Sequence, residues 1–326
     1  MFWERSEKGI VCGLCARKCI IPEGGRGFCG IRVNKEGKLY TLSYGKVVAT
    51  NVDPIEKKPL FHFHPGALAY SYSTFGCNWR CKFCCNYDIS QYHLRVKERK
   101  PEEIVEGAER EGCKIISHTY TEPTIFYEFA LDVAKMAKKR GMKNTFVTNG
   151  YMEEEPLKAI SKYLDAVTVD FKASGSEKFL RKYCSVPSAE PVFRFIEKVL
   201  ELGIHVEITD LIVPEIGDDV ESFKKLVKWL VELNDEIPFH VLRFFPNFKM
   251  LDVPPTPIEE VEEFVKKAKK LGLKYVYVGN VVGSEFENTY CPKCGELLIE
   301  RRGFFVIQKI DEPLCPKCGE EINIIL

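Results

Sequence analysis

The sequence predicts an α/β protein: a partial (β/α)6 barrel with a small four-cysteine, metal-binding module at each end of the chain. Two observations predict this architecture. Between residues 70 and 280, short β-type runs alternate with amphipathic helical runs, which favours parallel strands joined by helices. Eleven of the 14 cysteines fall into groups of four, three and four at short spacings. A chain of 326 residues also exceeds the usual size of a single core, so appendages are expected.

Seven runs are candidate strands: residues 70–74, 114–119, 144–148, 166–171, 206–213, 240–245 and 274–278. The helical runs between them are residues 101–112, 124–141, 155–164, 189–203, 221–233 and 258–272. Six units are too few for a closed eight-stranded barrel, so we expect a partial barrel or an open sheet. In either architecture the reactive groups gather at the carboxyl ends of the strands, where the loops converge.

These runs and the cysteine groups predict four segments. We expect an N-terminal four-cysteine module over residues 1–40, a linker over 41–69 that contains DPIEKKPL, a barrel over 70–283 and a C-terminal zinc ribbon over 284–326.

Composition excludes several classes of function. The 47 basic and 47 acidic residues cancel, so the net charge offers no footprint for nucleic acid or an anionic membrane. No apolar run of membrane-spanning length and no signal-peptide pattern occurs, so we expect a cytoplasmic protein. Cysteines in CxxC-type spacings without an export signal then favour metal or iron–sulfur ligation over disulfides.

The central cysteine group is the candidate for chemistry. Cys77, Cys81 and Cys84 follow the first predicted strand directly. Structural zinc sites are closed by four protein ligands, whereas a catalytic metal keeps a position open. Three thiolates can hold three corners of a [4Fe–4S] cube and leave its fourth iron free. The alternatives are a zinc knuckle that uses Cys85 as its fourth ligand, or a set of buried cysteines.

The segment around these cysteines resembles the signature of the radical S-adenosylmethionine (SAM) superfamily, CxxxCxφC, with Phe83 as the aromatic residue before the last cysteine. The resemblance implies a radical-SAM barrel in which the open iron chelates SAM. It also implies one-electron cleavage of SAM to methionine and a 5′-deoxyadenosyl radical that abstracts hydrogen. The cofactor performs the difficult step, and the protein positions it and excludes competing reactions.

The loop after the second predicted strand resembles the SAM-binding loop of these proteins. Thr121 and Glu122 stand where relatives carry a GGE or GGEP motif for the SAM ammonium, and Glu122 keeps the carboxylate. Tyr120 and Thr121 replace the two glycines, so the backbone approach to SAM differs. The same Thr-Glu-Pro sequence also fits a helix start, and the two readings are compatible.

The next two loops resemble stretches of the activating enzymes for glycyl radical enzymes. The TNG turn and the DFK sequence imply SAM contacts for Asn149, Asp170 and Lys172. Alternatively, Asp170 and Lys172 form a buried ion pair, because residues two apart on a strand share a face. Val147 replaces an aspartate of those enzymes, so a monovalent-cation site is not carried over.

The remaining candidates are Phe83, Thr209 and Leu211 for cofactor binding, and His240 and Arg243 for catalysis. A histidine in a strand more often packs with a hydrogen bond, and an arginine near a strand end often only pairs with a carboxylate.

The terminal cysteine groups are closed quartets. In the second, Cys291, Cys294, Cys315 and Cys318 form two identical CPKCG knuckles, the pattern of a zinc ribbon. In the first, the quartet is Cys12, Cys15, Cys19 and Cys29. Zinc or an auxiliary iron–sulfur cluster fits this group, and its compactness favours zinc. The unpaired Cys113 and Cys184 are expected to be small core residues.

Stretches along nearly the whole chain resemble the radical SAM component of the AmmeMemoRadiSam system, itself related to pyruvate formate-lyase activating enzymes. They lie at residues 12–32, 53–66, 75–86, 120–128, 254–257 and 288–295. The resemblance implies association with AMMECR-type and Memo-like proteins and an electron donor such as ferredoxin or flavodoxin. It names no substrate, which could be a small molecule or a protein.

Two alternative functions stay open. The first is activation of a glycyl radical enzyme, and the second is a non-catalytic iron–sulfur or zinc protein for electron transfer or assembly. A polar cluster also precedes the first barrel strand, and we expect it to pack linker against barrel or to contact substrate: Asp53, Glu56, Lys57, His62 and His64.

Overall fold

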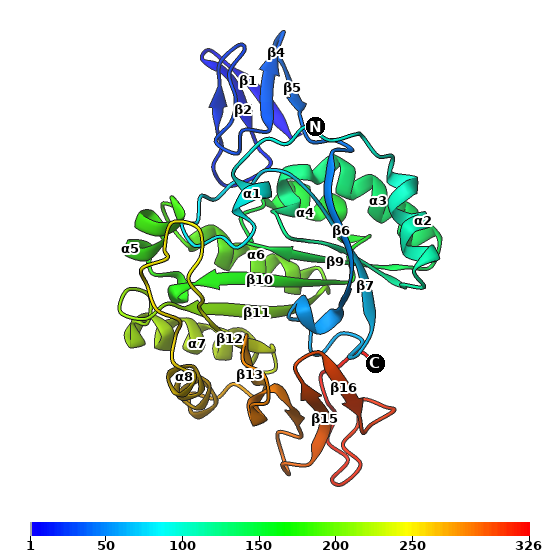
Figure 1. Ribbon diagram of the computed structural model, residues 1–326, viewed down its shortest axis with the longest axis vertical. Coiled ribbons are helices and arrows are strands. Elements are labelled where there is room, and N and C mark those ends of the chain that lie inside the picture. The colour runs from blue at the N-terminus through cyan, green and yellow to red at the C-terminus, as the bar shows by residue number, and fades with distance from the viewer. Residues whose placement is uncertain (1) are drawn as a thin grey trace.

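The computed structural model of the chain describes residues 2–326 and is built around one eight-stranded sheet (Figure 1). Seven strands are parallel and follow one another in chain order, and β6 pairs antiparallel with β7 at one edge. The strands are β6 (Val47–Pro54), β7 (Leu68–Thr74), β8 (Ile115–His118), β9 (Lys143–Thr148), β10 (Ala166–Lys172), β11 (His205–Ile212), β12 (Phe239–Arg243) and β13 (Val276–Gly279).

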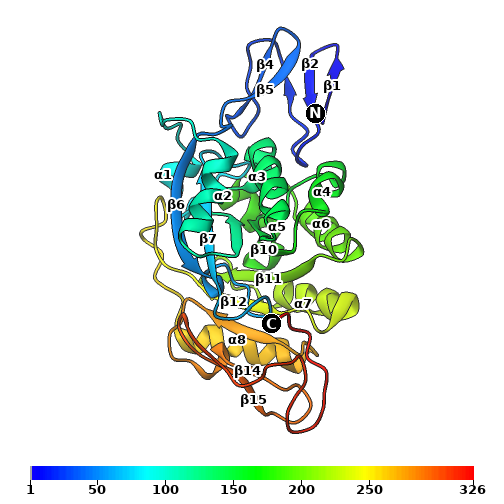
Figure 2. The ribbon, with the colours of Figure 1, turned by 90° about the vertical axis from the view of Figure 1, so that its right-hand side faces the viewer.

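Six helices connect the parallel strands and cover the outer face of the sheet (Figure 2). They are α2 (Pro101–Arg110), α3 (Tyr127–Lys139), α4 (Glu154–Ser161), α6 (Glu190–Glu201), α7 (Val220–Asn234) and α8 (Ile258–Lys270). Each buries an apolar stripe against the sheet and carries its charged residues outside. The predicted partial (β/α)6 barrel is thereby confirmed, with β13 as a seventh parallel strand. Because β6 and β13 occupy opposite edges of the sheet, the barrel stays open.

The segment expected to be a linker contributes to the barrel itself. Residues 47–54 form the edge strand β6, and residues 55–63, here called the plug segment, continue into the barrel interior. Thr168 of β10 donates its hydroxyl to the carbonyl of Lys58, at 2.5 Å. The carboxylate of Glu207 on β11 accepts the backbone N–H groups of Phe61 and His62, at 2.9 and 2.7 Å. The plug segment therefore fills the part of the barrel that faces the amino ends of the strands.

The N-terminal module lies at one end of the molecule (Figure 1). Its strands are β1 (Trp3–Ser6), β2 (Gly9–Cys12), β3 (Ile20–Ile21), β4 (Arg32–Lys35) and β5 (Lys38–Thr41). It docks on the loop after β9, where the backbone N–H of Ala16 donates to Tyr151 and that of Glu153 donates to Leu14. A bidentate ion pair between buried Arg32 and Glu128 of α3, at 2.6 and 2.7 Å, adds to this contact.

The C-terminal module lies at the opposite end and consists of β14 (Thr289–Tyr290), β15 (Leu297–Arg302) and β16 (Phe305–Gln308). Fully buried Arg301 joins it to the plug segment, since its guanidinium donates to the carbonyl of Phe61 at 2.7 Å and lies 3.7 Å from the carboxylate of Glu56. Within residues 2–326, no helix is both long and apolar enough to cross a membrane.

Candidate functional site

The central cysteines lie on the loop that follows β7, at the carboxyl end of the parallel sheet. Gly76 begins this loop with a φ of 100°, in the region that favours glycine. A side chain there would also collide with Ile31 of the N-terminal module, since a Cβ would meet Ile31 Cγ1 at 2.5 Å. The loop that carries Cys77, Cys81 and Cys84 is therefore shaped by contact with the N-terminal module.

A second segment holds the same loop from the other side. The backbone N–H groups of Arg80 and Lys82 donate to the carbonyls of Cys184 and Tyr183, at 2.9 and 2.8 Å. Phe83 packs between Phe179 and Phe244 with ring centroids 5.7 and 6.2 Å apart. Cys184 is fully buried, as expected, but its contact with the triad loop was not foreseen, because nothing in its local sequence points there.

The three thiols lie in surroundings that disfavour free thiolates. Burial and the nearby Glu122 carboxylate raise the pKa of Cys77 well above its ordinary value. The neighbouring Cys184 thiol and burial do the same for Cys81, and burial raises the pKa of Cys84. Cys85 is exposed, unlike the other three. Such thiols ionise when a cation is bound, which is how metal ligands behave.

Glu122 lies at the carboxyl end of β8 and is nearly fully buried. Its Oε1 accepts hydrogen bonds from the backbone and hydroxyl of Thr124 and from the hydroxyl of Thr148, at 3.1, 2.6 and 2.7 Å. Its Oε2 accepts one bond, from the backbone N–H of Asn149, at 2.8 Å. Both roles predicted for this loop, a helix start and a ligand contact, are compatible with this geometry. Oε1 caps the turn that leads into α3, and Oε2 keeps capacity for another donor. Thr121 ties this loop to β7 by donating to the carbonyl of Thr74.

Asn149 connects the loop after β9 to the triad. Its side-chain amide donates to Oδ1 of Asn78, the residue after Cys77, at 2.7 Å. The following Gly150 has a φ of 67°, and a Cβ there would approach Val169 and Val192 within 3.0 Å. Cys77, Glu122 and Asn149 are therefore brought together from three adjacent strand ends.

Asp170 and Lys172 form an ion pair at 3.3 Å at the end of β10. Asp170 also accepts the hydroxyl of Thr209 from the neighbouring β11. Burial opposes a charged Lys172, but the Asp170 carboxylate and the nearby Cys81 outweigh it and raise the pKa of Lys172. This pair lies on the same side of the site as Cys81, and Leu211 is buried beside Lys172 in the register of β10 and β11.

The two catalytic candidates lie at opposite ends of β12. Arg243 ends the strand, donates to the carbonyl of Thr256 at 2.6 Å and stacks over exposed Phe245. His240 is the second residue of the strand and is buried, with Nε2 2.7 Å from Glu207 beside the plug segment. Only Arg243 lies at the strand ends that carry the cysteines.

The polar residues before β7 pack the plug segment and β6 against neighbouring parts of the chain. Buried Lys58, which the sequence analysis did not single out, pairs with Asp53 at 2.7 Å, and Lys57 reaches the same carboxylate at 2.8 Å. The Tyr120 hydroxyl also donates to Asp53. His62 is buried between the carbonyl of Asn323 and the hydroxyl of Tyr277. These contacts attach the plug segment to the barrel and to the C-terminal module.

The C-terminal quartet is closed. Cys291 and Cys318 have sulfur atoms 3.6 Å apart, as do Cys294 and Cys315. Among residues 2–326, this is the one place where three or more candidate metal ligands lie within 4.8 Å of one another. The spacing fits one tetrahedral zinc ion, whose sulfur ligands lie about 3.8 Å apart when each Zn–S bond is about 2.3 Å.

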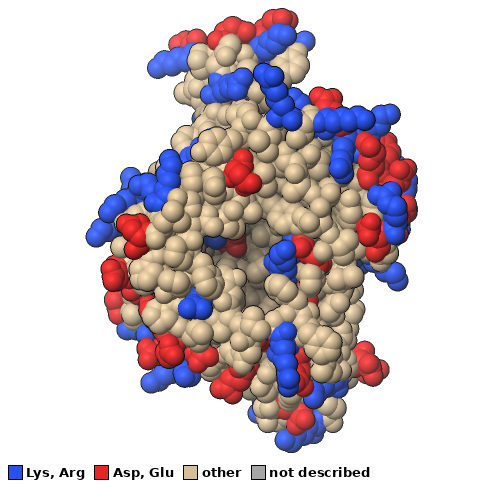
Figure 3. Space-filling model, in the orientation of Figure 1, with Lys and Arg blue, Asp and Glu red and all other residues tan. Residues whose placement is uncertain are grey.

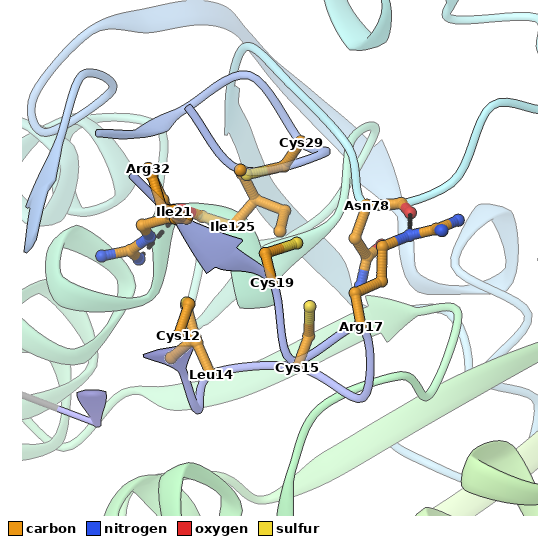
Figure 4. A pocket seen from close by; sticks show the side chains of 11 residues that line it. Cys12, Leu14, Cys15, Arg17, Cys19, Ile21, Cys29, Arg32, Asn78 and Ile125 are labelled. Carbon is orange, nitrogen blue, oxygen red and sulfur yellow. Dashed lines mark hydrogen bonds between the residues drawn. The ribbon is translucent and has the colours of Figure 1, made fainter. Parts of the chain in front are cut away.

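The N-terminal quartet lines a cavity of its own (Figure 4). Its four cysteines come from β2, the loop after it, and the loop before β4. Arg17, Arg32 and Asn78 complete the polar part of the wall.

Comparison with known proteins identifies the class to which this fold and site belong. The model of the radical SAM superfamily matches residues 71–230, from β7 into α7. The chain belongs to the radical SAM superfamily, whose members bind SAM and a [4Fe–4S] cluster.

Two relatives are similar to this chain in sequence. It is 49% identical over 306 residues to the uncharacterized protein MJ0808 of Methanocaldococcus jannaschii, a match that covers 92% of this chain and 90% of that protein. It is 27% identical over 210 residues to the pyruvate formate-lyase-activating enzyme of Clostridium pasteurianum, covering 60% of this chain and 85% of that enzyme.

Among solved structures, Streptococcus suis SuiB bound to S-adenosylmethionine shares the fold, with a TM-score of 0.52 and 14% sequence identity. The match covers 73% of this chain, which spans only 56% of SuiB.

Proposed function

We propose that this chain is a radical SAM enzyme in which Cys77, Cys81 and Cys84 hold three irons of a [4Fe–4S] cluster. The single observation that carries the proposal is the convergence of these thiols with Glu122 and Asn149 at three adjacent strand ends. The superfamily match to the same segment supports it.

The residues around the triad fit such a cluster. Cys85 is exposed, whereas the other three cysteines are partly buried, so the loop offers three thiols and leaves one iron without a protein ligand. Trp79 Nε1, on the triad loop, is buried without a hydrogen-bond partner among the residues described. Buried N–H donors of this kind need acceptors, and the sulfides of a cluster are acceptors.

When bound, the cluster and SAM supply a 5′-deoxyadenosyl radical that abstracts hydrogen from the substrate. The chain's own residues bind and orient SAM. Glu122 Oε2 keeps acceptor capacity for the SAM ammonium, and the Asn149 amide is held beside Cys77. We assign further SAM contacts to Thr121, Phe83, Asp170, Lys172, Thr209 and Leu211.

The substrate enters from the open side of the barrel in this proposal. Figure 3 shows a hollow at the centre of the face that Figure 1 presents, with charged side chains at its wall. Arg243 at the end of β12 is the catalytic candidate that lies on the cysteine side. The proposed substrate is a small molecule or a protein. His240 is assigned a packing role, because Glu207 and the plug segment enclose it.

The proposal also assigns the segments that flank the barrel and the partners of the chain. We assign one zinc ion to the C-terminal quartet, with a zinc ribbon over residues 284–326. We assign residues 1–40 to the N-terminal module and 70–283 to the barrel, to which the segment 41–69 adds the edge strand β6 and the plug segment. An external donor such as ferredoxin or flavodoxin supplies the electron, and AMMECR-type and Memo-like proteins are proposed partners.

A second candidate, activation of a glycyl radical enzyme, is favoured by one observation: the chain is 27% identical to a pyruvate formate-lyase-activating enzyme. The two candidates differ in substrate. Incubation with SAM, reductant and a glycyl radical enzyme would give a protein-based glycyl radical, detected by electron paramagnetic resonance, only if this candidate holds.

The test of the first candidate is anaerobic reconstitution, reduction with dithionite and assay of 5′-deoxyadenosine from SAM. We expect the product from the unaltered chain and none from Cys81→Ala. Cluster content without product would instead support a non-catalytic iron–sulfur protein and overturn the enzyme assignment.

A further inference from the structure

We infer that the N-terminal quartet binds a second iron–sulfur cluster, rather than the zinc ion that its compact sequence favours. The site consists of Cys12, Cys15, Cys19 and Cys29, and nothing in the comparisons assigns it. The inference goes beyond the proposed function, since the quartet has no part in holding SAM.

The spacing of the sulfur atoms differs between the cysteine groups. The C-terminal quartet gathers its four sulfurs within 4.8 Å, the geometry of one tetrahedral metal ion. Across residues 2–326 neither the N-terminal quartet nor the central triad gathers even three sulfurs within that distance. In a cluster with several irons, thiolates bound to different irons are held further apart than thiolates that share one ion. The N-terminal quartet thus resembles the central triad and differs from the C-terminal quartet.

Two buried N–H donors in the wall of the quartet cavity lack hydrogen-bond partners among the described residues. Arg32 and Asn78 line the quartet cavity, and both side chains are more than nine-tenths buried. Arg32 Nε and Asn78 Nδ2 have no hydrogen-bond partner in the described part of the chain. A zinc ion bound by four cysteines offers only cysteine sulfurs as acceptors. An iron–sulfur cluster adds bridging sulfides, which accept such N–H groups.

Hydrogen bonds to other parts of the chain hold these two side chains in place. The terminal nitrogens of Arg32 donate to Glu128, at 2.6 and 2.7 Å, and one of them also donates to the carbonyl of Ile125 at 3.2 Å, so the guanidinium is held in place beside the cavity. The Asn78 Oδ1 atom is occupied by Asn149. Phe28 adds a backbone N–H that donates to Cys19 Sγ at 3.4 Å. The wall therefore presents fixed N–H donors around the four thiols.

The quartet cavity lies next to the loop of the central triad. Asn78 follows Cys77 directly and also lines the quartet cavity, and Arg17 from the quartet loop donates to the Asn78 carbonyl. The two cysteine sites therefore share a wall. Four cysteine ligands leave no iron open for substrate, so a cluster in the quartet would serve electron transfer beside the SAM site.

The test is metal analysis of the full chain after anaerobic reconstitution with iron and sulfide. The key variant, Cys77→Ala/Cys81→Ala/Cys84→Ala, removes the central triad. We expect it to retain two or four irons with equal sulfide and about one zinc per chain. Reduction should give the electron paramagnetic resonance signal of an iron–sulfur cluster. An iron-free variant with about two zinc ions per chain would overturn the inference.

Two controls make the result specific. Cys291→Ala/Cys294→Ala should lose the zinc and keep the iron of both sites. Adding Cys19→Ala and Cys29→Ala to the triple variant should remove the remaining iron, and retention of that iron would overturn the assignment to the quartet. If the fivefold variant does not fold, Arg32→Met in the triple-variant background provides the second measurement. We expect a shifted spectrum or lowered iron content there, and an unchanged spectrum and content would contradict the role of the Arg32 donor.

The outcome is distinguishable from failure of the proposed function. If the unaltered chain forms no 5′-deoxyadenosine, the SAM assignment is overturned. The iron content of the triple variant does not depend on that reaction and still tests the second cluster.

Discussion

The side-chain amide of Asn149 donates a 2.7 Å hydrogen bond to Oδ1 of Asn78. This contact joins the turn after β9 to the loop that carries Cys77, and the backbone of Asn149 simultaneously binds Glu122 at 2.8 Å. One residue thereby positions two loops of the proposed SAM site.

Replacing this residue tests the relationship. Asn149→Ala removes the bond to Asn78, so we expect SAM to bind about tenfold or more weakly, while the cluster remains. Equilibrium binding of SAM to the reconstituted protein measures the effect. Asn234→Ala, at the exposed end of α7, is the control and should not alter affinity. Equal affinity in both variants would remove Asn149 from the site.

Replacing Arg301 tests the contact, here called the joint, between the C-terminal module and the barrel. Its buried guanidinium contacts Phe61 and Thr289, at 2.7 and 2.8 Å, and pairs with Glu56. Arg301→Ala leaves the Glu56 carboxylate buried and unpaired, so we expect a loss of about 3–5 kcal/mol and a fall in Tm of about 4–7 °C. Arg302→Ala, whose side chain is 78% exposed, should change Tm by less than about 1 °C. Similar Tm values for the two variants would contradict this account of the joint.

Asp210 gives a pH dependence with a definite sign. Burial raises its pKa to about 6, even though Ser174 donates two hydrogen bonds to it. An unfolded aspartate titrates near pH 4, so the folded state binds the proton more tightly. The stability from this proton is complete below about pH 4 and is lost as pH rises through about 6.

Asp210→Asn stays neutral at every pH and should lack this loss. Between pH 5 and 8 we expect the unfolding free energy of the unaltered chain to fall about 1.4 kcal/mol more than that of the variant. Denaturant titrations across this range measure the difference. Asp311→Asn, on the surface, is the control and should follow the unaltered chain. Parallel curves for Asp210→Asn and the unaltered chain would contradict the raised pKa.

The C-terminal quartet predicts a separation of stability from chemistry. Cys315→Ser should remove about one zinc per chain and lower Tm, because the four thiols close one ion. Iron content should stay the same, since the central triad lies at the other end of the parallel strands. Metal analysis with a thermal melt measures both quantities. Loss of SAM cleavage from a folded Cys315→Ser protein would show that the quartet has a catalytic part.

Local sequence patterns predicted the sheet and the position of the triad. The parallel strands are buried on both faces, so they read as nearly continuous apolar runs, and the cysteine spacing marked the first loop. Strand β6 was missed because Asn51 and Val52 are exposed at a sheet edge, where the strand pattern is weak.

The parts that depend on distant partners could not be read from the sequence. Lys58 is charged and looks like a surface residue, yet Asp53 and the barrel strand β10 enclose it. Arg80 of the triad loop donates to Cys184, and Arg32 pairs with Glu128, each across more than 90 residues of sequence, and no local periodicity encodes such pairings. The sequence also could not establish whether Asp170 and Lys172 pair with each other. The structure shows this ion pair, at 3.3 Å.

The most direct test of the central claim is the quantity of 5′-deoxyadenosine formed from SAM by the reduced, anaerobically reconstituted chain. We expect formation of this product by the unaltered protein and its absence from Cys81→Ala, with both proteins folded. A fully reconstituted cluster in the unaltered protein without 5′-deoxyadenosine would contradict the account.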